Sequence, residues 1–354
     1  MQAIDPRAFI FDFSRREIAD WLAARKIAAY RASQIFQWVH LRQCDDFDEM
    51  TDLSKAIRQE LAAHFRISRL QLEQVETSAD GSRKSLYRLE DGAHIESVLI
   101  PEKDHYTLCI SSQVGCAQGC QFCLTARGGL ERNLSRGEII AQVRDALHAL
   151  QDDHTMPRGL TNIVFMGMGE PLDNYANLIG AIETLTDNDF GLRFASRRVT
   201  VSTAGLVPRL ADLGRDTRVN LAVSLNATDN RTRSRLMPIN RRYPLEDLLA
   251  ACARYPLPPG RMITFEYILM EGINDSPADA RRLARLLRPI RAKINLIPFN
   301  QNPFSRLRRP SPEAIAAFRE LLCDAHYTAL VRHSKGQDIS AACGQLRAEG
   351  PGKK

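Results

Sequence analysis

The period of the apolar residues changes along the chain and divides it into regions. Between about residues 15 and 65, apolar side chains recur every three or four positions, which predicts short amphipathic helices. From 81 to 101 the pattern becomes extended, with two short runs joined by the turn dipeptide Asp91-Gly92. The pattern therefore predicts a small helical region followed by a β-hairpin.

The rest of the chain alternates between apolar runs and amphipathic stretches. The runs predict strands at 107–112, 162–166, 198–202, 219–225, 262–269 and 293–299. The stretches predict helices at 135–150, 175–185, 206–213, 245–255 and 276–287, with a closing helix at 312–325 and strand at 328–333. Ser135 followed by Glu138 is a capping box that begins one helix. Strands that alternate with helices predict an α/β fold whose parallel sheet curls into a partial (β/α)6 barrel, with its chemistry at the carboxyl ends of the strands.

These patterns give a domain plan. We expect a helical accessory domain at 1–80, a β-hairpin connection at 81–103, a core barrel at 104–346 and a frayed tail at 347–354. No apolar stretch approaches the roughly 18–20 residues that cross a bilayer, and the first residues lack the apolar segment of a secretory signal. A cytoplasmic protein without membrane partners is therefore expected, and a monomer is the default.

Composition adds a bias toward nucleic acid. With 354 residues, 44% hydrophobic and 25% charged, the chain is an ordinary globular protein, which excludes disordered and collagen-like classes. The net charge of +6 is unevenly spread. Residues 281–335 hold twelve basic and three acidic side chains, and Arg231–Arg242 hold five arginines without an acid. Guanidinium groups bind phosphate bidentately, so both clusters are candidates to bind phosphate groups; an ordinary solvated surface is the alternative.

The eight cysteines do not indicate a disulfide scaffold, because they are sparse in a large chain without an export signal. Cys44, Cys252 and Cys323 stand alone in helical contexts and are expected to be small buried residues. The others include a cluster, and clustered cysteines in a reducing compartment indicate metal or redox chemistry.

That cluster follows the first barrel strand. Cys116, Cys120 and Cys123 form C-x3-C-x2-C, with Phe122 before the last cysteine. Three thiolates can hold three irons of a [4Fe-4S] cluster and leave the fourth iron open to a ligand. Zinc would need a fourth Cys or His at close spacing, and none follows Cys123.

Small and polar residues end the later strands. Gly169 and Glu170 follow the second strand. Further candidates at the ends of the third, fourth and sixth strands are Ser202, Ser224, Leu225, Asn226 and Asn300. Each alone is typical of a satisfied strand-end group. Together they predict a ring around the barrel mouth that suits a nucleoside and amino acid ligand.

The cysteine loop resembles that of the radical S-adenosylmethionine (SAM) enzymes. The stretches 108–116, 166–172, 224–227 and 338–346 look more specifically like the bacterial radical SAM RNA adenine C2-methyltransferases, over nearly the whole chain. The resemblance implies that Cys116, Cys120 and Cys123 bind one [4Fe-4S] cluster and that the strand-end residues bind SAM. Asn226 is a departure, since many relatives carry His there.

The resemblance also implies a reaction. One SAM methylates Cys343, a second is cleaved to a 5′-deoxyadenosyl radical, and that radical takes hydrogen from the S-methyl group. The resulting carbon adds to C2 of an adenine, at position 2503 of 23S rRNA and in many cases position 37 of tRNA. A base takes the C2 proton, and Cys109 then releases the product through a transient disulfide with Cys343. Glu96 matches the proposed proton acceptor, although Cys109 is an alternative, and on its own Glu96 is only a glutamate on a strand.

Three interpretations remain open at this stage. The first is C2 methylation of rRNA, with tRNA as a further substrate and a flavodoxin-type protein as electron donor. The second is C8 methylation of the same rRNA adenine by the same cysteines. The third is a non-enzymatic, metal-containing nucleic-acid-binding protein, which would need neither Cys109 nor Cys343.

Overall fold

The computed structural model describes residues 5–152, 159–302 and 305–348, so most of the expected tail at 347–354 lies outside the described residues. The strands are β1 (Ala8–Phe9), β2 (Phe65–Arg66), β3 (Gln71–Thr77), β4 (Arg83–Arg88), β5 (His94–Pro101), β6 (Tyr106–Cys109), β7 (Gln113–Gly115), β8 (Leu130–Asn133), β9 (Leu160–Phe165), β10 (Val199–Thr203), β11 (Asn220–Ser224), β12 (Ile263–Leu269), β13 (Ala292–Pro298) and β14 (Ala329–Val331). The helices are α1 (Arg15–Ala24), α2 (Arg31–Phe36), α3 (Lys55–His64), α4 (Arg136–Asp152), α5 (Tyr175–Thr186), α6 (Val207–Asp216), α7 (Asn230–Leu236), α8 (Leu245–Ala253), α9 (Pro277–Leu287) and α10 (Pro312–Asp324).

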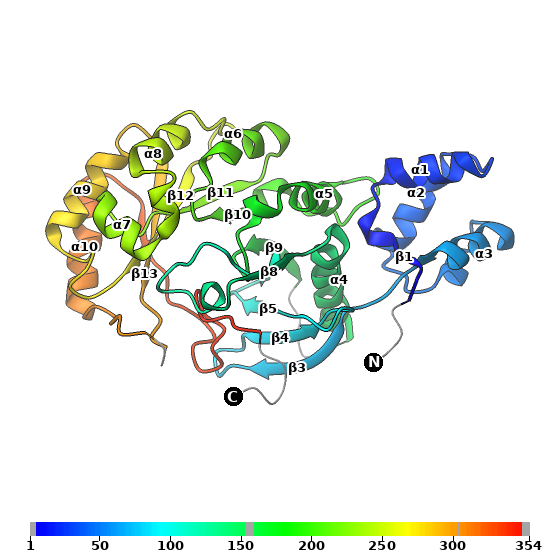
Figure 1. The fold of residues 1–354 in the computed structure, drawn as a ribbon, viewed down its shortest axis with the longest axis horizontal. Coiled ribbons are helices and arrows are strands. Elements are labelled where there is room, and N and C mark those ends of the chain that lie inside the picture. The colour runs from blue at the N-terminus through cyan, green and yellow to red at the C-terminus, as the bar shows by residue number, and fades with distance from the viewer. Residues whose placement is uncertain (1–4, 153–158, 303–304, 349–354) are drawn as a thin grey trace.

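One ten-stranded sheet organises the molecule, in the order β14-β13-β12-β11-β10-β9-β6-β5-β4-β3. In this sheet the neighbours from β6 through β9, β10, β11, β12 and β13 to β14 pair in parallel, whereas β3, β4 and β5 extend it in antiparallel pairing. Helices α4, α5, α6, α8, α9 and α10 form an arc along the outer side of the curved sheet (Figure 1). The predicted α/β class, with its parallel barrel strands and hairpin extension, is confirmed.

Several elements were not predicted: the short strands β1, β2, β7 and β8, and two longer segments. The segment Gln71–Thr77 is strand β3, paired with β4, although the sequence pattern placed 1–80 in a helical region. The segment Asn230–Leu236 is helix α7, within one of the arginine clusters. The capping box at the start of α4 is present as predicted, because Ser135 and Glu138 exchange backbone-to-side-chain hydrogen bonds of 2.8 and 3.1 Å.

The two faces of the barrel sheet have different surroundings. Tyr267 on β12 stacks on Phe318 of α10, with ring centroids 5.5 Å apart, so this side chain faces the helices. Its neighbour Glu266 therefore points to the inner face, because side chains alternate along a strand. The register pairs Glu266 with Ser224, and the corresponding positions on the other strands, Ser202 and Cys109, share that inner face.

The N-terminal region packs against the barrel through a common core. Helices α1, α2 and α3 lie together beside α4 (Figure 1). Buried residues such as Phe11, Ile18 and Leu22 belong to the same apolar cluster as the barrel strands. Gly137 in α4 packs so closely on Phe9 that an added Cβ would lie 2.6 Å from its ring. The accessory region is thus held firmly on one side of the barrel. Within the described residues, no helix is both long and apolar enough to span a membrane.

Candidate active site

The three clustered cysteines lie in a loop between the two strands of a hairpin. Strand β7 pairs antiparallel with β8, and the loop between them carries Cys116, Cys120 and Cys123. Gly115 begins the loop with φ of 75°, and a Cβ there would lie 2.0 Å from the carbonyl oxygen of Gly129. Only glycine fits this close approach of the two strands, so the loop is closed tightly at its base.

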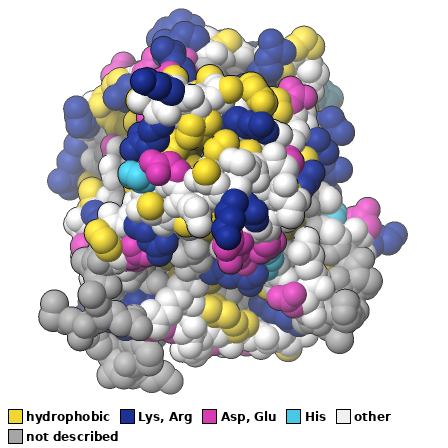
Figure 2. Space-filling model, turned by 90° about the vertical axis from the view of Figure 1, so that its right-hand side faces the viewer, with side chains coloured by type: hydrophobic (Ala, Val, Ile, Leu, Met, Phe, Trp, Pro, Cys, Tyr) yellow, Lys and Arg dark blue, Asp and Glu magenta, His cyan; other side chains and the backbone are white. Residues whose placement is uncertain are grey.

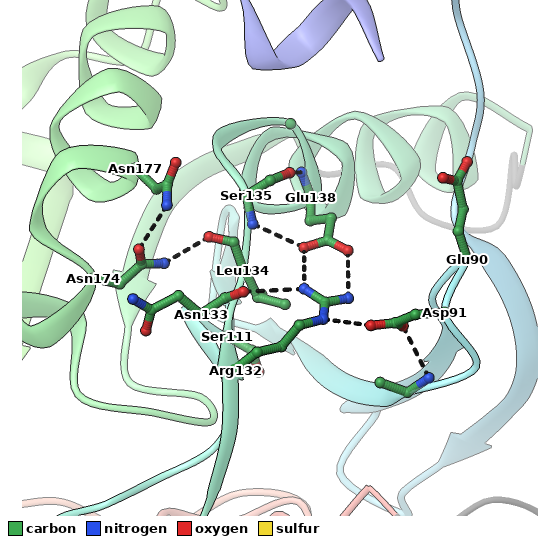
Figure 3. Close-up of polar contacts among 12 residues, drawn as sticks. Glu90, Asp91, Ser111, Arg132, Asn133, Leu134, Ser135, Glu138, Asn174 and Asn177 are labelled. Carbon is green, nitrogen blue, oxygen red and sulfur yellow. Dashed lines mark hydrogen bonds and ion pairs between the residues drawn. The ribbon is translucent and has the colours of Figure 1, made fainter. Parts of the chain in front are cut away.

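Arg132 fastens this hairpin to the rest of the barrel (Figure 3). Its guanidinium group donates two hydrogen bonds of 2.8 Å to Glu138 of the α4 capping box and another to Asp91 in the β4–β5 turn. Asn174 donates to the carbonyl oxygen of Leu134 at 2.7 Å, just beyond β8. The cysteine loop is therefore anchored to three separate parts of the fold.

The chemistry of the thiols fits an iron–sulfur cluster. Burial raises the pKa of Cys116 to about 12, so its thiolate needs a positive charge beside it, which iron supplies. Among the described residues, no three His, Cys, Asp or Glu side chains converge enough to hold a single metal ion. A cubane cluster binds each thiolate through a different iron.

The loop that carries Cys343 lies directly on the cysteine loop. The backbone N–H of Leu124 donates to the carbonyl oxygen of Gly344 at 2.7 Å, and the Thr125 hydroxyl donates to that of Leu346 at 2.7 Å. Gly344 has φ of 82°, and a Cβ there would lie 2.9 Å from the carbonyl oxygen of Phe122. The chain therefore brings Cys343 to the edge of the predicted cluster site.

Cys109 and Cys343 share this site. Cys343 is accessible to solvent, but the surrounding protein raises its pKa to about 11, and the negative charge of Glu266 acts in the same direction. Cys109 is buried at the end of β6, where burial and the nearby Cys343 thiolate both raise its pKa. All eight cysteines are free thiols in this structure. The two thiols thus lie near each other in their protonated form.

Glu96 lies on the inner face of β5, four per cent exposed. Lys84 forms an ion pair with it at 3.2 Å, and the backbone N–H of Arg347 donates to its carboxylate at 2.8 Å. Burial raises the pKa of Glu96, while Lys84 and the Arg347 amide oppose the shift. The structure places Glu96 where the Cys343 loop joins the sheet.

Glu170 and Asn300, at the barrel mouth, differ in whether their side-chain oxygens have hydrogen-bond partners. Both oxygens of Glu170 are bonded, by the backbone N–H groups of Leu172 and Ala204 at 3.1 and 2.7 Å, and burial raises its pKa to about 7. Asn300 donates to the carbonyl oxygen of Cys343 at 3.1 Å, but its own carbonyl oxygen is buried and has no hydrogen-bond partner among the described residues. An unpaired buried acceptor is costly. A ligand with a hydrogen-bond donor would satisfy it, which fits SAM.

The remaining strand-end candidates are of two kinds: some are bonded within the protein, and others are available to a ligand. The Ser202 and Ser224 hydroxyls have no hydrogen-bond partner among the described residues and face the barrel interior. Leu225 is buried, and its N–H donates to the carbonyl oxygen of Glu266. Asn226 has φ of 57°, and its side chain accepts from the backbone of Ile268 at 2.8 Å. Its amide thus shapes the loop, whereas the serines are available to a ligand.

Arg233 corrects the prediction that the whole Arg231–Arg242 cluster binds phosphate. Its side chain is fully buried and donates to the carbonyl oxygens of Ala204, Ser224 and Leu225 and to Asn240. It remains cationic although burial lowers its pKa to about 10. Arg233 therefore ties the loops that end β10 and β11 together and cannot reach RNA. Nothing in its sequence context separates it from its exposed neighbours.

The exposed arginines between 281 and 335 include two groups in different places, one at helix α9 and one in the loop after β13. Arg281, Arg285 and Arg288 are exposed at helix α9, on the outer side of the sheet. The loop 305–309 after β13 exposes its three arginines at the carboxyl ends of the strands. On the face of the N-terminal region, basic side chains are scattered among acidic and hydrophobic ones (Figure 2). A basic surface at the barrel mouth therefore rests on the 305–309 loop and on the exposed arginines of the other cluster.

Comparison with known proteins gives the family. Residues 9–67 match the ribosomal RNA large subunit methyltransferase N-terminal domain, and residues 110–284 match the radical SAM superfamily. A dual-specificity RNA methyltransferase RlmN from Desulfosudis oleivorans is 57% identical over 96% of this chain and 91% of its own length. The RlmN of Geobacter sulfurreducens is 54% identical over 94% of this chain and 90% of its own.

A solved structure agrees. A radical SAM methyltransferase from Sphaerobacter thermophilus is 46% identical, covers 97% of this chain and 100% of its own, and superimposes with a TM-score of 0.90. The similarity in sequence and in fold covers the accessory region and the barrel alike. The chain therefore belongs to the RlmN family of dual-specificity RNA methyltransferases, which are radical SAM enzymes.

Proposed function

We propose that this protein methylates C2 of an adenine in 23S rRNA, and of an adenine beside the tRNA anticodon, with Cys343 as the methyl carrier. The observation that carries the proposal is the placement of two thiols, Cys343 and Cys109, at the edge of the three-cysteine loop. A methyltransferase that used SAM directly would need neither thiol. Family membership argues against the non-enzymatic alternative.

The residues that would hold the cofactors fit them. Cys116, Cys120 and Cys123 would bind one [4Fe-4S] cluster, and the strand-end groups around Asn300 would bind SAM. When bound, these groups supply one-electron cleavage of a carbon–sulfur bond. The rest of the chemistry belongs to side chains. The proposal includes two SAM molecules per turnover, a flavodoxin-type donor, and a monomer that works in the cytoplasm.

Cys343 first carries a methyl group on its sulfur. Adenine C2 is an electron-poor carbon that cannot attack a sulfonium methyl group, so the carbon on Cys343 must instead add to C2 after loss of a hydrogen atom. Glu96 then takes the proton from C2, with Lys84 beside it to stabilise the ionised carboxylate, and the unpaired electron of the adduct leaves to the cluster that Cys116, Cys120 and Cys123 would hold. The Cys109 thiol loses its proton and its sulfur bonds to Cys343 sulfur as the sulfur–carbon bond breaks. The released carbon keeps the electron pair of that bond and takes a proton to become the methyl group.

Two cysteine variants test this sequence of steps. Cys343→Ala should abolish methylation because the carrier is lost, and Cys109→Ala should accumulate protein covalently joined to RNA because release is blocked. Gel mobility of labelled RNA under denaturing conditions measures the joined species. Cys323→Ala, at an exposed position on α10, is the matched control. RNA that is still methylated by the Cys343→Ala protein would overturn the mechanism. Mass spectrometry of the modified adenosine distinguishes C2 from C8.

A further inference from the structure

Glu266 is a buried carboxyl group inside the barrel that the proposed steps do not use. It is seven per cent exposed and lies on the inner face of β12, opposite the side chain of Tyr267, which packs on α10. Asn295 on β13 donates to it at 2.9 Å and is its one hydrogen-bond partner among the described residues. A carboxyl group has capacity for further hydrogen bonds, so Glu266 can still bond to a ligand in the barrel.

The position of Glu266 relative to Cys343 limits what that ligand is. Its charge is close enough to oppose ionisation of the Cys343 thiol. The carbon on Cys343 must bond to adenine C2 if the proposed function holds, on which this inference rests. The ring atoms bonded to C2 are N1 and N3, both hydrogen-bond acceptors. N3 is crowded by the ribose, whereas N1 lies at the open edge of an unpaired adenine.

The two inner-face carboxyl groups have contrasting partners. Glu96 forms an ion pair with Lys84 at 3.2 Å, which favours its carboxylate. In the part of the chain that the structure describes, the bonded partner of Glu266 is a neutral amide alone. The charged groups that face it, Lys293 and Arg332, attract its carboxylate but form no ion pair with it within 4.0 Å. Burial dominates and raises the pKa of Glu266 to about 7. When the surroundings of two carboxyl groups move their pKa values apart, one of the two commonly acts as an acid and the other as a base.

We infer that Glu266, in its protonated form, donates a hydrogen bond to N1 of the target adenine. This bond identifies adenine by an acceptor beside C2. It also withdraws electron density from C2, which favours addition of the electron-rich carbon carried by Cys343. No co-reactant is required, because the proton is shared with N1 and stays on the carboxyl group when the product leaves.

Binding of RNA to the whole protein tests the inference without turnover. The probe is a short 23S rRNA fragment that contains adenosine, 1-deazaadenosine or 3-deazaadenosine at the target position. At pH 6 the wild-type protein should bind the 1-deaza fragment about tenfold more weakly, the effect of one lost hydrogen bond, and should bind the 3-deaza fragment like adenosine. Glu266→Ala should bind the adenosine and 1-deaza fragments equally.

The pH dependence provides a second readout. Wild-type affinity for the adenosine fragment should fall as pH rises through about 7, because the carboxylate then faces the N1 lone pair. Glu266→Gln keeps a donor but cannot ionise, so it should retain binding at pH 6 and lose this part of the pH dependence. Glu170, whose pKa is also about 7, remains unchanged in that variant, so its contribution persists there. Glu320→Gln, exposed on α10, is the matched control.

The outcomes separate this inference from the proposed function. If wild-type protein methylates C2 but Glu266→Ala still discriminates against the 1-deaza fragment, or if Glu266→Gln keeps the full pH dependence, the Glu266 assignment is wrong. Weaker binding of the 3-deaza fragment would contradict the choice of N1. If wild-type protein loaded with cluster and SAM leaves C2 unmodified, the proposed function fails whatever the binding data show.

Discussion

Arg233 shows how one buried charge can hold a site together. Its guanidinium group donates to the carbonyl oxygens of Ala204, just after β10, and of Ser224, the last residue of β11. These two strands carry the SAM candidates Ser202 and Ser224. An arginine can serve several acceptors because it has five N–H donors in a fixed plane. The arrangement of those two loops therefore depends on this side chain.

Replacing Arg233 by leucine should destabilise the protein by about 3 kcal/mol, because several buried acceptors would lose their partners. Urea unfolding followed by circular dichroism measures the change. Arg235→Leu on the same helix is the matched control; its side chain is exposed, so a change within about 0.5 kcal/mol is expected. Equal stability of the two variants would show that Arg233 does not have this structural role.

Residue-level prediction from sequence is most specific where spacing itself carries the chemistry. The C-x3-C-x2-C pattern identified three residues that the fold gathers in one tight loop. Spacing says little about burial, however, so it could not separate Arg233 from exposed arginines. Cys323 was expected to be buried but is exposed on α10, next to the fully buried Leu322, because a step of one residue turns a helix by about 100°. Cys44 and Cys252 are buried as predicted.

At the scale of elements, the hairpin formed by β7 and β8 depends on Arg132. Arg132→Ala should leave the overall fold intact but loosen this hairpin, because the Glu138 and Asp91 contacts are lost. Hydrogen exchange of the amides in 113–133 should become at least several-fold faster. Glu131→Ala, at the exposed neighbouring position, should leave exchange unchanged. Unaltered exchange in the Arg132→Ala protein would refute the anchoring role.

The elements that sequence patterns missed have weak periodicity. Strand β3 exposes Leu72 and Val75 by 53% and 46%, so its apolar residues do not mark a buried face. Helix α7 is short, and its inward residues are Leu236 and the buried Arg233, which a hydrophobic pattern cannot detect. The barrel strands were predictable because both of their faces are largely buried, which makes them nearly continuous apolar runs.

At the scale of the whole molecule, charge reversal in two groups of exposed arginines should affect RNA binding differently. Reversing Arg306, Arg308 and Arg309 to Glu, in the loop after β13, should weaken RNA binding. It should also reduce the slope of log affinity against log salt by about 2, since each lost phosphate contact contributes roughly 0.7–0.9. Filter binding over a range of salt concentrations measures both effects.

Reversing Arg281, Arg285 and Arg288 at helix α9 provides the matched control for this prediction. These side chains are exposed at α9, on the outer side of the sheet, so the salt slope should stay near its wild-type value. A larger loss from the α9 variant than from the loop variant would place the RNA on the opposite side from the barrel mouth. The sequence alone could not distinguish these groups, because both belong to one basic stretch.

The hydrogen bond between Thr125 and Leu346 joins residues 221 positions apart in the sequence. Another contact, from Ser78 to Asp338, fastens the same loop across 260 positions. During translation, the segments that would hold iron and SAM therefore leave the ribosome well before Cys343 does. A chain that terminates before residue 343 would contain all three cysteines of the predicted cluster site but no methyl carrier. The last part of the chain to be synthesised thus supplies the thiol on which the proposed transfer begins.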